Sequence, residues 1–295
     1  MRTIPYLPAI AIALINSGCT ATRVEGRGAG SPDEGTRSVA VGLASQARIY
    51  HGSITNSAQL DQTDQFWKRA EEEIYRSPEE LVAQDARETR RGEKLPKLMR
   101  GNPNKKLLAL TFDDGPHQIY TNLLLNILQR EQVKATFFVI GKMVERYPNL
   151  LRSIDAAGMD IGNHTFSHVT LTKIPEQDAE IEYRANNDIV KKVIGKTMRF
   201  CRPPGGDYDA EVIEASTHCG LTTVLWTDDP GDYANPGQAK IEERVLSKIT
   251  NGGIILLHDG VAETLNVLPQ IIAYGKKKGF QFVTISELQR SINTN

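Results

Sequence analysis

From residue 106 onward, short apolar segments alternate with longer segments in which apolar residues recur every three or four positions. The first kind is typical of strands buried on both faces, and the second is typical of helices that cover a sheet. The pattern predicts seven strands, at 107–112, 135–140, 159–163, 197–201, 222–226, 253–257 and 281–285. It predicts helices near 119–131, 143–157, 175–195, 208–218, 237–250 and 262–278, and a last helix that begins at Ser286.

This regular alternation predicts parallel strands joined by crossover helices, and therefore an α/β fold. Seven repeats favour a distorted (β/α)7 barrel of parallel strands, with a doubly wound open sheet as the alternative. The positions of the reactive polar residues favour the barrel, because all of them follow predicted strands. They are Asp113, Asp114, Asn163, His164, Arg202, Asp228, Asp229, His258 and Asp259. In a parallel barrel those strand ends share one face, which is where active sites form.

The N-terminus has the features of an export signal. Met1 and Arg2 precede an apolar run over 4–15 that is shorter than a membrane span. The following Ser17-Gly18-Cys19 resembles a bacterial lipoprotein signal, although Asn16 stands where a Leu-like residue is expected. We expect a signal peptide over 1–18 and a lipid anchor on Cys19, which would hold the exported protein at the cell envelope. An ordinary cleaved signal and a secreted protein is the alternative.

Two further segments precede the barrel. Residues 19–62 are rich in Gly, Ser, Thr and Ala without a sustained period, which predicts a flexible linker. Residues 63–104 form a predicted helical extension, and residues 105–295 form the predicted catalytic domain. A first helix of the extension would place four apolar residues on one face: Phe66, Trp67, Ala70 and Ile74. A second helix is expected to begin at Ser77, with Pro78 at its first position and Glu80 at its third.

Composition excludes some classes of partner. The chain has 35 Lys and Arg residues against 36 Asp and Glu residues, so no basic excess points to nucleic acid. Membrane contact is expected only through the lipid anchor, and nothing implies a protein partner. Three cysteines cannot build a disulfide framework. Cys201 and Cys219 belong to opposite ends of one strand–helix unit, which predicts two buried free thiols.

Carboxylates and imidazoles at the strand ends suggest a metal site. Asp113 and Asp114 lie in the segment 111–117, directly after an apolar strand. His164 and His168 lie four residues apart, so they would share one face if a helix begins there. Asp114 and these two histidines would form a three-ligand set for one divalent metal ion, with zinc as the first candidate.

Two more segments add groups suited to hydrolysis. Arg202-Pro203-Pro204-Gly205-Gly206 cannot continue a strand or begin a helix, so it would form a rigid ledge. Its arginine can hold a carboxylate through a bidentate pair, and its glycines leave backbone N–H groups open to an oxyanion. In the segment 226–233, Trp226 and Tyr233 lie beside carboxylates, as suits a wall that binds sugar. The segment 256–259 adds His258 and Asp259.

These five segments, in this order along 106–292, resemble the polysaccharide deacetylase family, also called carbohydrate esterase family four or the NodB homology domain. The resemblance implies a metal-dependent hydrolase that removes N-acetyl groups from a polysaccharide containing N-acetylglucosamine. It implies Asp113 as general base, oriented by Arg202. It implies Asp114, His164 and His168 as metal ligands.

The resemblance also implies His258 as general acid, supported by Asp232. The N–H of Gly205 would stabilise the oxyanion, and Trp226 and Leu256 would line the acetyl pocket. Two residues depart from the pattern: Gly205 stands where the family often has Tyr, and Tyr233 stands where Trp is common. Both departures bear on substrate fit more than on the chemistry.

Three other functions are compatible with parts of the pattern. The same groups would cleave O-acetyl esters of a polysaccharide such as xylan. A non-catalytic glycan-binding envelope protein would be expected to lack the base or the ligands, which are all present here. A glycosidase would need two carboxylates on either side of the bond, ~5–9.5 Å apart, which two adjacent aspartates do not supply. The glycan itself stays open among peptidoglycan, chitin oligomers and an exopolysaccharide.

Overall fold

The computed structural model describes residues 75–292. The predicted signal peptide, Cys19, the linker over 19–62 and the apolar face around Phe66 and Trp67 lie outside the described residues. Within 75–292, none of the helices combines the length and the apolar character that a membrane span requires.

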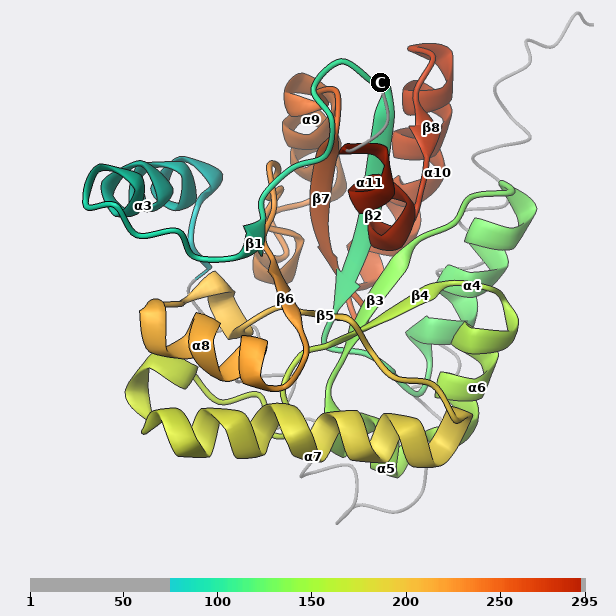
Figure 1. Ribbon diagram of the computed structural model, residues 1–295. Coiled ribbons are helices and arrows are strands. Elements are labelled where there is room, and N and C mark those ends of the chain that lie inside the picture. Colours follow the sequence, from blue (N-terminus) through green and yellow to red (C-terminus); the bar gives the residue numbers. More distant parts are fainter. Residues whose placement is uncertain (1–74, 293–295) are drawn as a thin grey trace, which may run out of the picture.

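A curled sheet of eight strands forms the centre of the molecule, with helices around it (Figure 1). Its strands are β1 (Lys97–Leu98), β2 (Leu107–Asp113), β3 (Thr136–Val139), β4 (Asp160–Asn163), β5 (Phe200–Cys201), β6 (Thr222–Val224), β7 (Gly253–His258) and β8 (Gln281–Phe282). They follow the order β1-β6-β5-β4-β3-β2-β7, with β8 beside β2, and all pairs are parallel. Nearly all residues of β2 and β7 are buried, so these two strands contribute strongly to the core.

The sheet curls far enough for the chain that follows β6 to reach β7 at the other edge of the sheet. Beyond β6, Asp228 forms a parallel bridge with Ile255 of β7, and the Leu256 N–H donates to the Asp228 carbonyl at 2.9 Å. The predicted barrel-like fold is therefore confirmed, and the open doubly wound sheet is excluded. All seven predicted strands are present. Strand β1 was not predicted, because two residues that depend on pairing with β6 leave no periodic pattern.

Nine helices of the described chain join or flank these strands. They are α3 (Pro78–Arg90), α4 (Tyr120–Arg130), α5 (Gly141–Arg146), α6 (Pro148–Ala156), α7 (Glu176–Ile194), α8 (Ala210–His218), α9 (Gln238–Lys248), α10 (Ala262–Lys277) and α11 (Ile285–Ile292). The single helix predicted near 143–157 is two helices, because the backbone of Tyr147 is non-helical before Pro148. Short 3-10 turns occupy Leu171–Lys173, Pro204–Gly206 and Asp232–Ala234.

The start of α3 is the predicted one. The Ser77 hydroxyl accepts from the N–H of Glu80 at 3.2 Å, and the Ser77 N–H donates to the Glu80 carboxylate at 2.8 Å. Pro78 occupies the first turn, where its missing N–H costs no hydrogen bond. This capping box fixes the residue at which α3 begins.

Both described cysteines are free thiols, as predicted. Cys201 is buried in β5, whereas Cys219 is only partly buried, so the expectation of burial is wrong for Cys219. Burial raises the pKa of Cys201 to about 11, so this thiol is neutral at physiological pH.

Candidate active site

The parallel strands deliver the predicted site residues to one face. Asp113 ends β2, His258 ends β7, and the two residues are register partners. Asn163 ends β4 beside Cys201 of β5, so His164 and Arg202 follow neighbouring strands. This placement follows from the buried strands themselves, since the carboxyl ends of parallel strands meet at one edge.

Asp114, His164 and His168 come together as a candidate metal site. One atom from each of the three side chains can be chosen so that all lie within 4.8 Å of one another. Oδ1 of Asp114 lies 3.4 Å from Nε2 of His164 and 3.1 Å from Nε2 of His168. Nδ1 of His164 lies 2.7 Å from the carbonyl oxygen of Arg202, which holds the proton on Nδ1. His164 therefore presents the lone pair of Nε2, as a metal ligand does, and the donor set suits a divalent cation.

Asp114 is ionised in this cluster. Burial alone would raise its pKa, but His168 and His164 outweigh that effect and hold the pKa of Asp114 well below its usual range. The backbone of Asp114 also lies in the left-handed region, with φ of 72°. Such a conformation is costly for a residue other than glycine and is held here by the surrounding structure.

The segment His164–His168 is a tight loop, so the condition under which the two histidines would share a helical face is not met. Thr165 and His168 have φ of 63° and 58°, which a continuous helix does not allow. The two imidazole rings nevertheless lie 5.0 Å apart. The left-handed residues of the loop thus bring the two rings close together, as the four-residue spacing would also have done on a helix.

Side chains of helix α7 hold this loop by hydrogen bonds to its backbone. The N–H groups of Phe166 and Ser167 donate to one carboxylate oxygen of Glu182, at 2.9 and 2.7 Å. The side-chain amide of Asn186 donates to the carbonyl of Thr165 at 2.8 Å. Glu182 and Asn186 were not predicted, because polar residues on a long amphipathic helix look like its solvent-facing side.

Asp113 is held by Arg202. Nη1 of Arg202 donates to Oδ1 of Asp113 at 2.7 Å and to the hydroxyl of Thr111 at 2.9 Å. The contact uses one guanidinium nitrogen, so the expected bidentate pair is not formed. Phe138 and Trp226 lie over the guanidinium, at 4.2 and 5.4 Å from its carbon to the ring centroids. Oδ2 of Asp113 is buried and has no hydrogen-bond partner within 75–292.

His258 pairs with Asp232, as the resemblance implied. Nδ1 of His258 lies 2.7 Å from Oδ1 of Asp232. The other carboxylate oxygen accepts from the His258 N–H at 2.8 Å and from the hydroxyl of Thr264 at 2.6 Å. Burial by itself would lower the pKa of His258, but Asp232 outweighs it and raises this pKa to about 10. Nε2 is buried and finds no hydrogen-bond partner in the described part of the chain.

The ledge after β5 packs against Trp226. Gly205 and Gly206 have φ of 64° and 65°, and a Cβ on Gly206 would lie 2.3 Å from the indole ring. The N–H of Gly206 already donates to the Pro203 carbonyl at 3.0 Å, which leaves Gly205 as the candidate oxyanion donor. Leu256 is fully buried within β7. The ring of Tyr233 lies 5.3 Å from that of His258.

Three other carboxylates at these strand ends have different surroundings. Asp229 accepts from the N–H of Gly231 at 2.8 Å, and Asp259 accepts from the hydroxyl of Thr121. Neither oxygen of Asp228 has a hydrogen-bond partner within the described chain. Burial raises the pKa of Asp228 and of Asp259 to about 7, so both are partly protonated at neutral pH.

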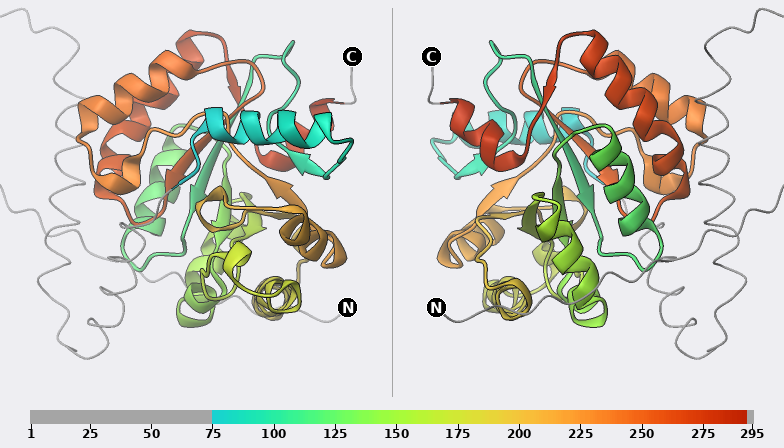
Figure 2. Two further views of the ribbon diagram at one scale, coloured as in Figure 1. Left: turned by 90° about the vertical axis from the view of Figure 1, so that its left-hand side faces the viewer. Right: turned by 90° about the vertical axis from the view of Figure 1, so that its right-hand side faces the viewer.

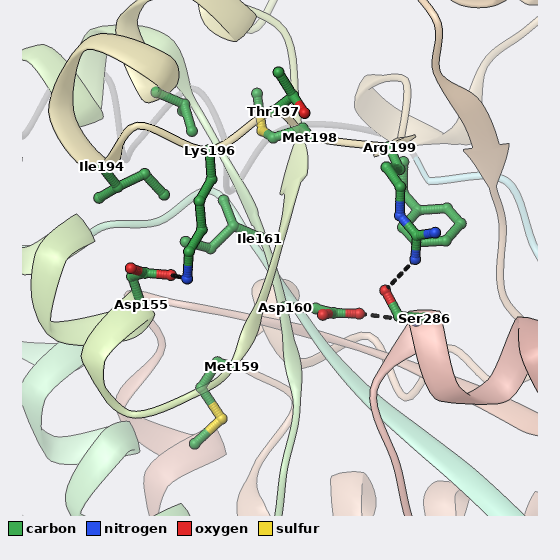
Figure 3. Close-up of a pocket in the computed structure, with 12 residues that line it drawn as sticks. Asp155, Met159, Asp160, Ile161, Ile194, Lys196, Thr197, Met198, Arg199 and Ser286 are labelled. Atoms are coloured by element: carbon green, nitrogen blue, oxygen red, sulfur yellow. Dashed lines mark hydrogen bonds and ion pairs between the residues drawn. The ribbon is translucent and has the colours of Figure 1, made fainter.

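A cavity of about 140 Å³ lies at the opposite ends of β4 and β5 (Figure 3). The Arg199 guanidinium donates to the Ser286 hydroxyl at 2.8 Å, and Lys196 pairs with Asp155. Asp160 accepts from the Ser286 N–H at 2.8 Å. Its charged groups are thus engaged with one another, and they lie at the amino ends of the strands, away from the candidate active site.

Comparison with known proteins agrees with this geometry. The family described as polysaccharide deacetylase matches residues 100–224. A peptidoglycan-N-acetylglucosamine deacetylase of Bacillus cereus is 38% identical over 192 residues, which cover 63% of this chain and 90% of the relative. The chain therefore belongs to the polysaccharide deacetylase family.

Two solved structures share the fold. A peptidoglycan N-acetylglucosamine deacetylase, solved in complex with a substituted benzamide, is 32% identical with a TM-score of 0.66. That match covers 69% of this chain and 97% of the other. A pseudoenzyme of carbohydrate esterase family four from Bacillus anthracis is 28% identical with a TM-score of 0.64, over 66% of this chain and 69% of the other. The family thus includes both enzymes and a protein described as a pseudoenzyme.

Proposed function

We propose that this protein is a metal-dependent N-deacetylase of a glycan that contains N-acetylglucosamine, with peptidoglycan as the first candidate substrate. The observation that carries the proposal is one cluster at the strand ends. It contains a three-ligand set, a carboxylate with an open oxygen, and a histidine with an open Nε2. Family membership supports the same chemistry.

Asp114, His164 and His168 would hold one divalent cation, with zinc as the first candidate. The fit rests on the converging donor atoms and on the Nδ1 contact of His164, which leaves Nε2 open. When bound, such a cation supplies Lewis acidity toward the acetyl carbonyl oxygen and toward water.

Asp113 would act as the base. Arg202 occupies Oδ1, so Oδ2 is the oxygen available to take a proton from the attacking water. The water oxygen bonds to the acetyl carbon, and the carbonyl oxygen gains negative charge. The N–H of Gly205 would stabilise that charge, as positioned backbone donors do.

His258 would act as the acid. Asp232 keeps it protonated and fixes its ring through Nδ1, so Nε2 carries the proton for the leaving nitrogen. When the carbon–nitrogen bond breaks, this proton passes to the amine, and acetate and a free amino sugar remain. Trp226 and Leu256, both buried and apolar, would enclose the acetyl methyl group.

Location at the cell envelope is part of the proposal. Its supports are the signal-like N-terminus ending at Cys19 and the similarity to peptidoglycan deacetylases. Lipid attachment at Cys19 would place the enzyme next to its polymer.

Two other functions are the alternatives to N-deacetylation. The similarity to a pseudoenzyme supports a non-catalytic glycan-binding role. The base, the ligands, the arginine and the acid all occur here in one cluster, so catalysis is favoured. Cleavage of O-acetyl esters would use the same groups, so only substrate tests separate it from N-deacetylation.

Acetate release from three substrates tests the proposal: N-acetylglucosamine oligomers, peptidoglycan and acetylated xylan. We expect zinc-loaded protein to release acetate from the first two and to lose this activity after chelation, with recovery on adding metal back. Release from xylan alone would support the esterase. Activity that survives verified metal removal would contradict the metal-dependent mechanism.

A further inference from the structure

Tyr75, which lies before α3 and outside the segment matched by the family, reaches the candidate active site. Its ring centroid lies 4.3 Å from that of Tyr233 and 6.2 Å from that of Trp226. It meets the His258 imidazole edge-on, at 4.9 Å and 76°. With 6% of its surface exposed, Tyr75 is an inner residue of this face.

The backbone next to Tyr75 is bonded to the ledge after β5. The N–H of Arg76 donates to the carbonyl of Gly205 at 2.9 Å, on the residue whose N–H is the candidate oxyanion donor. The Arg76 guanidinium pairs with Asp207 at 3.0 Å, just beyond that ledge. Tyr75 and Arg76 therefore both lie along the edge of the candidate site formed by the ledge after β5.

Helix α3 fixes this arrangement through partly buried polar contacts. Gln84 accepts from Arg76 at 2.6 Å and donates to the carbonyl of Tyr208 at 3.0 Å. Lys97 contacts Glu88 and Asp85, each at 2.7 Å, and the side chains of Lys97 and Glu88 are 5% and 4% exposed. Figure 2 shows α3, in cyan, lying across one side of the molecule. Tyr75 is thus held in place by the segment that follows it in the chain.

We propose that Tyr75 is a substrate-positioning residue that completes the aromatic wall of the site, on the side where the sugar leaves. This inference rests on the proposed function. His258 must reach the leaving nitrogen, so a ring packed against His258 borders the sugar that carries this nitrogen rather than the acetyl group. A flat ring with a polar edge suits the apolar face and the hydroxyl rim of a pyranose. The extension would then form part of the active site.

The test compares Tyr75→Ala and Tyr75→Phe in the full chain, with Tyr274→Ala on α10 as a matched control. Kinetics are measured on an N-acetylglucosamine pentamer and on 4-nitrophenyl acetate, which has an acetyl group but no sugar. For Tyr75→Ala we expect kcat/KM on the pentamer to fall roughly 10–100-fold, through KM, as expected for one lost aromatic contact. Turnover of the small ester should stay within about threefold, while Tyr75→Phe and Tyr274→Ala should resemble the wild type on both.

Three results would overturn the inference. The first is a Tyr75→Ala variant whose kcat/KM on the pentamer equals that of the wild type. The second is an equal loss of activity on both substrates, which indicates a structural role. The third is a higher kcat/KM of Tyr75→Ala on the pentamer, which indicates that the ring blocks the site. A wild type that releases no acetate would instead refute the proposed function. In that case, calorimetric binding of the pentamer still tests Tyr75, since the alanine variant should bind it at least about tenfold more weakly.

Discussion

At the scale of single residues, the site depends on buried carboxylates that hold other side chains in place, and Asp232 is the clearest case. Asp232 is fully buried and uses both oxygens, one on the His258 ring and the other on the His258 N–H and Thr264. This arrangement raises the pKa of His258 although burial opposes it. Asp232 is the largest of the influences that raise this pKa, ahead of Asp114 and Asp113, so it is the partner whose loss matters most to the proposed acid.

Replacing that partner, as Asp232→Asn, should shift the high-pH limb of activity to lower pH. Without the carboxylate, the strongest influence that raises the pKa of His258 is gone while burial still lowers it, so this pKa falls and the proton is lost at lower pH. A bound cation lowers the same pKa in both proteins, so the comparison between them keeps its sign. We expect kcat near neutral pH to fall about 10²–10⁴-fold. Superimposable pH profiles for the two proteins would show that His258 is not the acid.

Most of these residues could be predicted from the sequence, because Asp113, Asp114, His164 and His258 are reactive groups placed directly after apolar strands. Thr264 and Tyr75 could not. Thr264 begins a helix that shows only its amphipathic pattern, and Tyr75 reaches the site through long-range contacts. Gly205 supplies no ring where the family often has Tyr, whereas the ring of Tyr75 lies against Tyr233 and His258.

At the scale of elements, the site depends on how α7 holds the loop after β4. The loop has two residues in the left-handed region, and Glu182 binds the N–H groups between them. The sequence predicted that the two histidines could bind one metal ion together, but it did not decide the local structure that brings them together. A spacing of four fits a helix and also this loop, and only the tertiary contacts decide between the two.

Glu182→Gln should therefore weaken metal binding without removing a ligand. In the wild type one carboxylate oxygen accepts from both loop N–H groups and the other accepts from the Ser167 hydroxyl. An amide would place an N–H₂ group where that second oxygen is, facing a donor, and its neutral oxygen would hold the two N–H groups less strongly, so the loop would be held less firmly. We expect zinc affinity to fall about 10–100-fold in competition with a chelator, as for other groups that orient ligands. Glu180→Gln, on the same helix but paired with Arg184 and His218, serves as the control. Equal affinities for the two variants would refute the role of Glu182.

At the scale of the whole molecule, the barrel and the segment that begins at Tyr75 meet at the face that carries the candidate site. The alternation of strands and helices was enough to predict the parallel barrel, because fully buried strands such as β2 and β7 leave continuous apolar runs. It could not predict strand β1 or the contact of the extension with the site. Both depend on pairing between residues far apart in the chain, including Lys97 with Thr223 and Arg76 with Gly205.

The central claim is that one face combines a metal site with a separate base, Asp113. Asp113→Asn tests it most directly when zinc content and acetate release from N-acetylglucosamine oligomers are measured on the same sample. Asp228→Asn, at a neighbouring strand end, is the matched control. We predict full zinc content and an approximately 10²–10⁴-fold loss of acetate release for Asp113→Asn, and near-normal values for Asp228→Asn. Acetate release by zinc-loaded Asp113→Asn within about tenfold of the wild type would contradict the account.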